Sequence, residues 1–170
     1  MSRFAPGAKR RIGVAAIVAA LIFALDQWSK QLVLAHWPQS HDVPIPMLPA
    51  LDLALNWNRG VSFSIGNNLG SADRFIFVAL SLVVSAGLFF WVARGVKRLV
   101  LTGLALVIGG ALGNCWDRIR FGAVEDFIYF HVGAFHYPVF NLADSAICVG
   151  AGLLIFDSLF DRPLSHKNTP

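Results

Sequence analysis

Charged side chains are scarce in this chain of 170 residues, where Asp, Glu, Lys and Arg together make up 14%. Soluble domains carry about 25%, so the chain lacks the polar surface that a soluble protein needs. Hydrophobic residues make up 56%, and the mean hydropathy is +0.61. This composition excludes an ordinary soluble domain and predicts a single integral membrane domain over residues 1–170.

Residues for metal or nucleophile chemistry are few and poorly spaced. The two cysteines, Cys115 and Cys148, lie in apolar runs, which is typical of small buried hydrophobes and leaves the redox compartment undetermined. The five histidines have no H-x-x-x-H or H-E-x-x-H spacing, and no serine has a G-x-S-x-G context, so we expect neither a metal nor a cofactor. The basic residues flank apolar runs rather than aromatics, so we expect no nucleic acid partner.

Long apolar runs, by contrast, are plentiful, and four of them are long enough to cross a membrane. The predicted spans are approximately 12–34, 75–93, 99–116 and 139–160. The first follows a basic arm, as in a signal peptide, but no small-residue cleavage site follows it, so we expect a retained helix. Four glycines give the third span a small-residue face, which predicts close helix contact.

Lys and Arg are distributed unevenly between the two ends of these spans. Nine lie in the N-terminal arm, the turn at 94–98 and the C-terminal tail, and five lie at the other end. The positive-inside rule therefore predicts cytoplasmic termini, with residues 36–73 and 117–138 outside.

Both outer segments contain stretches with a period of two. Leu51–Trp57 and Val61–Ile65 alternate around a turn at 58–60, which predicts a β-hairpin whose apolar face rests on the membrane or covers a site. Four prolines exclude a helix before this hairpin. Ala123–His131 also alternates and predicts a further strand beside it.

Two acidic residues, Asp126 and Asp144, lie at the predicted outer boundary of the membrane. An ionised carboxylate costs about 2–3 kcal/mol or more at the centre of a membrane helix. Two carboxyls that share a site do not both ionise easily, so a pair holds one acid and one base, as hydrolysis by activated water requires. The structural alternative is that Asp144 caps a helix or pairs with Arg118, and that Asp126 is a solvated strand residue.

Two sets of polar residues with helical spacing lie at the same depth, on the third and fourth spans: Asn114, Asp117 and Arg118, and Asn141, Asp144 and Ser145. They predict a water-accessible cleft, in which Asn114 and Asn141 orient carboxylates or substrate and Arg118 braces an acid. Helix capping and structural bridging are the alternatives for Asn114 and Arg118. Asp26 and Lys30, four residues apart, are interpreted as an ion pair at the outer end of the first span.

Five segments, taken together, resemble the lipoprotein signal peptidase (signal peptidase II) family of bacterial aspartic membrane proteases. In order they are Asp-Gln-Trp-Ser-Lys at 26–30, Asn-Arg-Gly-Val-Ser-Phe at 58–63, Gly-Gly-Ala-Leu-Gly-Asn-Cys-Trp-Asp-Arg at 109–118, Val-Glu-Asp-Phe at 124–127 and Phe-Asn-Leu-Ala-Asp-Ser at 140–145. The resemblance covers roughly residues 20–157. It implies an all-α membrane protein with a small β element: four transmembrane helices, an extracytoplasmic β-cradle and a further outer segment near 66–73 that shields the cleft.

The resemblance also implies an activity and its residues. The expected substrate is a prolipoprotein whose lipobox cysteine bears diacylglyceryl, cleaved on the amino side of that cysteine at the outer face of the bacterial inner membrane. Membrane lipid and a globomycin-type inhibitor are further expected partners. Asp126 and Asp144 match the catalytic positions, and seven residues match supporting positions: Asp26, Lys30, Asn58, Gly60, Asn114, Arg118 and Asn141.

Two residues depart from the family pattern. Arg59 stands where we expect a small or hydroxyl residue, and Glu125 stands where an apolar residue is common. We expect Glu125 to point away from Asp126 and to alter the electrostatics of the rim. The alternative functions are a proton-coupled transporter that uses intramembrane carboxylates, and a scaffold without activity, although the chain lacks the paired repeats of transporters.

Overall fold

The computed structural model describes residues 7–37, 43–60 and 72–160. Most of these residues form four helices: α1 (Ala8–His36), α2 (Ala72–Ala93), α3 (Arg98–Phe121) and α4 (Leu142–Phe160). Each is long and apolar enough to cross a membrane. Large apolar side chains on their outer faces are exposed, with Val83 at 71% and Ile17 at 63%. Such surfaces suit contact with lipid rather than water.

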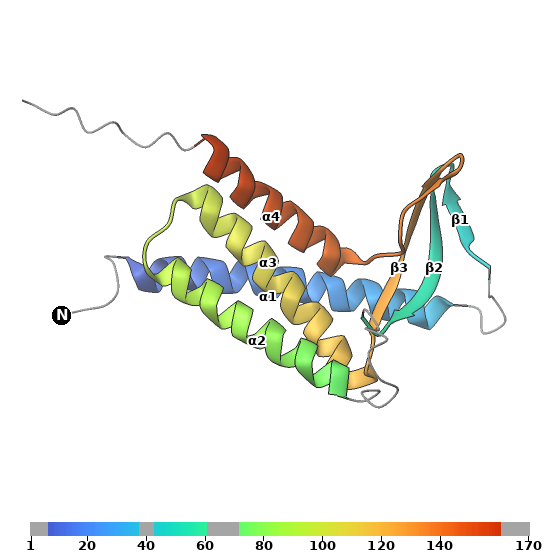
Figure 1. The fold of residues 1–170 in the computed structure, drawn as a ribbon, viewed down its shortest axis with the longest axis horizontal. Helices are drawn as coiled ribbons and strands as arrows, with labels where there is room; N and C mark the ends of the chain where they lie inside the picture. Colours follow the sequence, from blue (N-terminus) through green and yellow to red (C-terminus); the bar gives the residue numbers. More distant parts are fainter. Residues whose placement is uncertain (1–6, 38–42, 61–71, 161–170) are drawn as a thin grey trace, which may run out of the picture.

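Helix α3 lies at the centre of the bundle and packs against the other three helices (Figure 1). Its core side chains Leu104 and Ile108 are fully buried. Close approach to α4 depends on facing glycines, because a Cβ atom on Gly103 would lie 2.9 Å from the carbonyl oxygen of Gly150. The predicted small-residue face of this span is therefore a helix contact in the structure.

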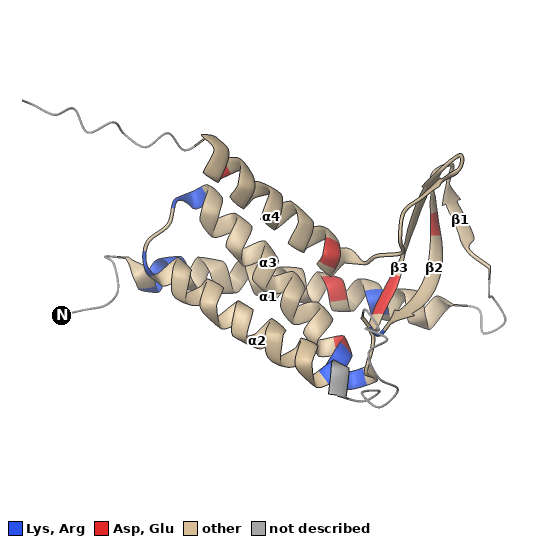
Figure 2. Cartoon of the chain, viewed as in Figure 1, with Lys and Arg blue, Asp and Glu red and all other residues tan. Residues whose placement is uncertain are grey.

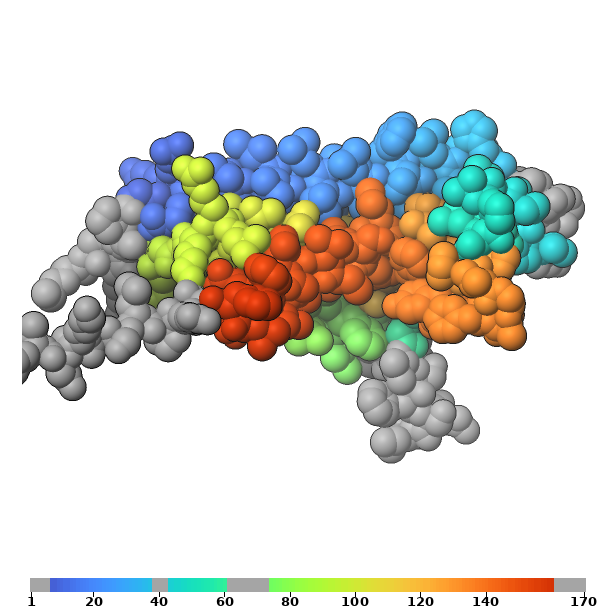
Figure 3. All heavy atoms as spheres, turned by 90° about the horizontal axis from the view of Figure 1, so that it is seen from above, coloured from blue at the N-terminus to red at the C-terminus, as the bar shows by residue number. Residues whose placement is uncertain are grey.

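A small antiparallel sheet lies at one end of the bundle, beside the C-terminal end of α1 (Figures 1 and 3). Its strands, in spatial order, are β1 (Ile45–Leu48), β2 (Leu51–Asn58), β3 (Val124–Val132) and β4 (Phe135–His136). In the register of β2 on β3, Asn58 faces Val124 and Asn56 faces Asp126. This pairing brings Asn58 close to Asp126 on β3.

The strand pairing differs from the predicted hairpin. Leu51–Trp57 is a strand, but its described partners are β1 on the N-terminal side and β3, rather than residues 61–65. The sequence analysis excluded a helix at the prolines but missed β1, because Pro46 occupies an edge strand, where proline is tolerated. The predicted arm at 61–65 and residues 66–71 of the predicted shield lie outside the described residues, and Ala72 begins α2.

Two helices also differ from their predicted bounds at the outer end. Helix α3 continues five residues beyond the predicted limit of 116 and ends at Gly122, which adopts the left-handed conformation with φ of 75°. Asp117 and Arg118 therefore lie on the same helix as Asn114, in agreement with their predicted helical spacing. Helix α4 begins at Leu142 instead of residue 139, because Phe140 forms a β-bridge with Ile128. Asn141 thus precedes the helix instead of lying on its face.

Candidate active site

The polar residues of the site come from all the elements that meet where the sheet joins the bundle (Figure 2). Most of them are buried although they are charged or amide-bearing, with 0% exposure at Asp26 and Asn141 and 1% at Asp117 and Asp126. Arg118 and Asp144 are half-buried, and Asn58 is exposed. Helices α1 and α3 supply Asp26, Lys30, Asn114, Asp117 and Arg118, strands β2 and β3 supply Asn58, Glu125 and Asp126, and the start of α4 supplies Asn141 and Asp144.

The deepest part is a charge cluster formed by Asp26, Lys30 and Asp117. The Lys30 ammonium lies 2.7 Å from Asp26 Oδ2 and 2.7 Å from Asp117 Oδ2. The predicted ion pair on α1 is thus one half of a larger cluster. Gln27 donates to Asp117 Oδ1 at 2.8 Å. Asp117 belongs to the polar set that predicted a cleft, but neither it nor Gln27 was predicted to support the site, although both interrupt apolar helices.

The cluster also stabilises the start of α4. Asp26 Oδ1 accepts a hydrogen bond from the backbone N–H of Ala143 at 3.0 Å. The first N–H groups of a helix have no partner within the helix, and the helix dipole favours an anion there. Asp26 therefore links the far end of α1 to the segment that carries Asn141 and Asp144.

Asp126 lies on β3 and receives two amide donors. Asn141 Nδ2 donates to its Oδ1 at 2.7 Å, and Asn58 Nδ2 donates to its Oδ2 at 3.0 Å. The pKa of Asp126 is raised to about 6, mainly by burial and in part by the nearby Asp144 carboxyl, while the hydrogen bonds from Asn58 and Asn141 lower it. The side chain therefore changes its protonation state close to neutral pH.

Asp144 lies at the third position of α4 and forms a reciprocal cap with Asn141. The backbone N–H of Asp144 donates to Asn141 Oδ1 at 2.8 Å, and the backbone N–H of Asn141 donates to Asp144 Oδ2 at 3.2 Å. This is the geometry of a capping box. The structural alternative of a helix cap is thus present, and the same carboxylate also accepts from Asn114 Nδ2 at 2.7 Å through Oδ1.

Asn114 connects the charge cluster to the acid pair, a name we use for Asp126 and Asp144. Its Oδ1 accepts from Lys30 Nζ at 3.2 Å and from Asn141 Nδ2 at 3.0 Å. Because its oxygen is committed to these donors, its Nδ2 must face Asp144. The contact with Lys30 thereby fixes the orientation of the Asn114 amide, so that its NH₂ group donates to Asp144.

Gly60 and Asn58 act together at the end of β2. The Gly60 N–H donates to Asn58 Oδ1 at 2.9 Å, so the Asn58 Nδ2 is the group left to face Asp126. Gly60 has φ of 92°, and a Cβ atom there would lie 2.6 Å from the Phe77 ring. Both facts favour glycine. The neighbouring Arg59, which departs from the family pattern, is exposed, so packing does not restrict the residue type at this position.

Arg118 is placed beside the acid pair. The guanidinium is close enough to Asp144 and Asp126 to attract both electrostatically. It donates to the Asn114 carbonyl oxygen at 3.4 Å and lies 5.0 Å from the centre of the Phe77 ring. Its Nε is buried with no hydrogen-bond partner among the described residues. This leaves a donor available to a bound molecule.

Glu125 points away from Asp126, as expected, but it is not at a rim. Only 1% of the residue is exposed, and its backbone N–H donates to Asp117 Oδ2 at 3.3 Å. Burial raises the pKa of Glu125 to about 8, with a further contribution from the charge of Asp117. The side chain is therefore protonated at neutral pH. The expectation of altered rim electrostatics was wrong, because the alternation of β3 turns this residue towards α3.

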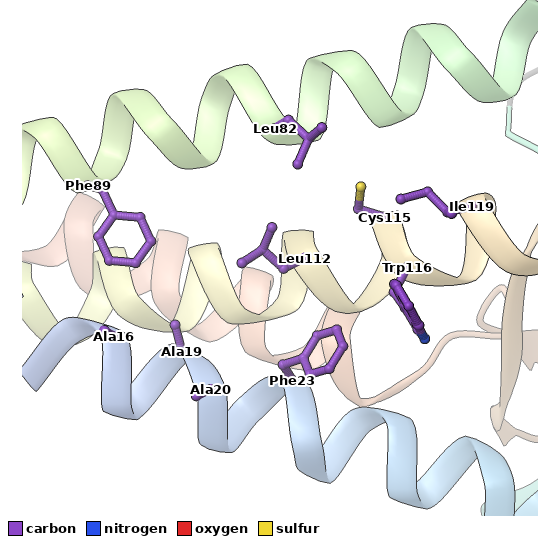
Figure 4. Close-up of a pocket in the computed structure, with 10 residues that line it drawn as sticks. All are labelled: Ala16, Ala19, Ala20, Phe23, Leu82, Phe89, Leu112, Cys115, Trp116 and Ile119. Carbon is purple, nitrogen blue, oxygen red and sulfur yellow. The ribbon is translucent and has the colours of Figure 1, made fainter. Parts of the chain in front are cut away.

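Two apolar hollows differ in their relation to the acids. One of about 390 Å³ lies between the sheet and α4 and includes Asp144, Phe140 and Cys148 in its lining. The other, of about 410 Å³, lies between α1, α2 and α3 and is lined by alanine, leucine and aromatic side chains with no carboxylate (Figure 4). Only the first opens beside the acid pair. Among the described residues, no three His, Cys, Asp or Glu side chains are grouped as a metal site requires.

Comparisons with known proteins agree on one family. The family model described as "Signal peptidase (SPase) II" matches residues 18–160. The chain is 41% identical to a lipoprotein signal peptidase of Methylocella silvestris, over 85% of each chain, and 43% identical to one of Coxiella burnetii, over 83% of this chain and 86% of that one.

The fold is similar to that of two bacterial membrane enzymes determined by the in meso method. One, at 2.3 Å resolution, has a TM-score of 0.77 and 22% sequence identity, and the alignment covers 99% of that chain and 100% of this one. The other, at 1.9 Å, has a TM-score of 0.77 at 24% identity, with 95% of it and 88% of this chain covered.

Proposed function

The chain belongs to the signal peptidase II family, and from that premise we propose that it is an aspartic endopeptidase that cleaves diacylglyceryl-modified prolipoproteins on the amino side of the lipid-bearing cysteine. The family establishes a protease that removes signal peptides from lipoproteins. The observation that carries the aspartic mechanism is the shared contact of Asn141, which donates from its side chain to Asp126 and from its backbone to Asp144.

The proposed chemistry uses one ionised and one protonated carboxyl. The ionised carboxylate takes a proton from water as the water oxygen attacks the carbonyl carbon, and the protonated carboxyl donates its proton to the carbonyl oxygen. The resulting tetrahedral intermediate then breaks its C–N bond. As it does so, one of its hydroxyls returns a proton to the carboxylate formed in the first step, and the other carboxyl gives its proton to the leaving amine. The raised pKa of Asp126, at about 6 because of its burial, supports this division.

The neighbouring groups supply hydrogen bonds without a competing cation in direct contact. Asn58, Asn114 and Asn141 satisfy carboxylate oxygens with neutral amides, so the proton of the pair remains shared. Arg118 has an unpartnered buried Nε beside the pair. We assign it the stabilisation of negative charge that develops on the carbonyl oxygen.

The substrate side is consistent with a lipid-modified chain. The hollow of about 390 Å³ beside Asp144 is walled by apolar side chains of β3 and α4. An apolar segment next to the scissile bond can bury its surface there and so place the carbonyl near Asp144. No charged side chain of the substrate is needed for this placement.

The proposed location follows from charge and burial. Figure 2 shows Lys and Arg at both ends of the bundle, but over the full sequence nine of the fourteen belong to the N-terminal arm, the 94–98 turn and the C-terminal tail. By the positive-inside rule, we therefore assign both termini to the cytoplasm and the acid pair to the outer face of the inner membrane. Substrates anchored by acyl chains in the outer leaflet then meet the site directly.

The test uses a synthetic lipobox peptide, with and without diacylglyceryl on its cysteine, and the purified full chain in lipid. We expect cleavage of the modified peptide only, at the bond preceding the cysteine by mass spectrometry, and inhibition by globomycin. Equal cleavage of the unmodified peptide, or a cut elsewhere, contradicts the proposed specificity. Proton flux across vesicles containing the chain, without peptide cleavage, would favour the transporter instead.

A further inference from the structure

The end of the bundle opposite the acid pair carries a groove that the proposed activity does not use. It lies between the first turns of α1 and α3 and has a volume of about 570 Å³. Its lining includes three arginines, Arg10, Arg11 and Arg98, together with the apolar Val14 and Leu101. We call it the basic groove.

The lining residues of the basic groove have helical spacing on both sides. Arg10, Arg11 and Val14 share one face of α1, and Arg98 and Leu101 are three residues apart on α3. On each helix the arginines precede the apolar residues and therefore lie nearer the end of the bundle. The groove is thus basic at its mouth and apolar towards the membrane interior.

The local field in the basic groove favours an anion for a second reason. The N-terminus of a helix carries roughly half a positive charge. Neither α1 nor α3 has a side-chain cap hydrogen bond or an acidic residue in its first turn. The acidic Asp157 on α4 lies 3.8 Å from Lys97 rather than in the lining of the groove. Arg10, Arg98 and two helix N-termini therefore border one open space.

We propose that the basic groove binds the phosphate headgroup of an anionic phospholipid, with the arginines around the phosphate and the lipid's upper acyl carbons against Val14 and Leu101. Guanidinium groups match phosphate oxygens in pairs, and basic pockets between membrane helices suit lipid headgroups. The apolar floor favours a lipid over free phosphate, which has no carbon to bury. This proposal goes beyond the peptidase activity and does not depend on it.

The test measures lipid binding to the purified full chain by native mass spectrometry, with phosphatidylglycerol and phosphatidylcholine of identical acyl chains. We expect phosphatidylglycerol to bind about tenfold more tightly than phosphatidylcholine. Replacing Arg10 and Arg98 together by Gln should weaken phosphatidylglycerol binding by about 25-fold, at roughly fivefold for each arginine. Arg94→Gln is the matched control, because Arg94 lies at the same end over the Phe90 ring and does not line the groove.

Three results would overturn the proposal: equal binding of the two lipids, equal losses in the double variant and in Arg94→Gln, or displacement of phosphatidylglycerol by millimolar inorganic phosphate, which would assign the groove to free phosphate. If the double variant does not fold, the wild-type chain still decides the question. Raising the salt concentration should then lower phosphatidylglycerol binding and leave phosphatidylcholine binding unchanged.

Discussion

The charge cluster and the acid pair lie side by side in one polar interior, yet their carboxylates have different partners. Asp26 and Asp117 both contact the ammonium of Lys30. Asp126 and Asp144 receive amide donors. An ammonium compensates negative charge directly, whereas an amide satisfies an oxygen without adding a charge. The comparison teaches that a cation compensates the carboxylates of the cluster, whereas neutral amides surround those of the pair, which share a proton in the mechanism proposed above.

The two regions are nevertheless connected through one amide. Asn114 accepts from Lys30 and donates to Asp144, so the cation of the cluster sets the donor direction at the pair. Changes to the pair should therefore remove activity and leave the fold intact. Changes to the cluster should reduce both.

The largest expected effect on cleavage comes from the pair itself. Asp126→Asn or Asp144→Asn removes a proton acceptor or donor, and general acid–base groups contribute about 10²–10⁴-fold, so we expect at least a thousandfold loss of cleavage in either variant. Asp52→Asn is the control, since Asp52 lies on the same sheet and pairs with His131. The thermal unfolding midpoint verifies the fold. A near-normal rate in either pair variant contradicts the mechanism.

Lys30→Met tests the charge cluster instead of the acid pair. It leaves Asp26 and Asp117 buried without their cation, which costs about 3–5 kcal/mol for a buried pair, and it releases Asn114. We expect a fall in the free energy of unfolding of this size, with a smaller loss of cleavage than in the pair variants. Adding Asp117→Asn should restore part of the stability.

The matched control for the cluster is Lys97→Met. The Lys97 side chain is 55% exposed and lies 3.8 Å from Asp157, and exposed pairs contribute about 0–1 kcal/mol. Denaturant unfolding in detergent measures both variants. Equal destabilisation by the two substitutions would show that the buried cation has no special role.

Asn58→Ala sharpens the comparison by removing one amide from the pair. Burial raises the pKa of Asp126 to about 6, and the Asn58 hydrogen bond keeps it from rising further. Its loss moves that pKa upwards, so the variant should titrate at a higher pH than the wild type in a profile of kcat/KM against pH. The loss of one hydrogen bond to a charged group costs roughly tenfold in rate. Asp52→Asn, on the same strand and paired with His131, should leave the profile unchanged.

Glu125→Gln has the smallest expected effect on cleavage and a distinct effect on stability. Because the folded-state pKa of Glu125, about 8, exceeds its ordinary value of 4.5, its contribution to stability is full below 4.5 and is lost as pH rises through 8. The wild type should therefore unfold at a lower temperature at pH 9 than at pH 6. The variant should lose this decline, and an identical decline in both proteins would refute the assignment.

Particular residues show how far the sequence could predict the fold and the site. Apolar run length predicted four spans, and the helices α1 to α4 are long and apolar enough to provide them. The alternation at Leu51–Trp57 indicated a strand, but no local pattern identified its partners, since β3 comes from a distant part of the chain. Glu125 illustrates the same limit. The alternation of its strand predicted that the side chain points away from Asp126, but not that it would be buried near Asp117.

The sequence by itself determined the membrane class, the end of the bundle at which the acids lie, and the family. Hydrophobic length and charge distribution act along one segment at a time, so they can be recognised without knowing what lies beside it. Only the tertiary structure decided which carboxylates meet Lys30 and which meet amides. Those partners come from α1, α3, β2, β3 and the start of α4, and buried charge is stabilised by the groups in contact with it.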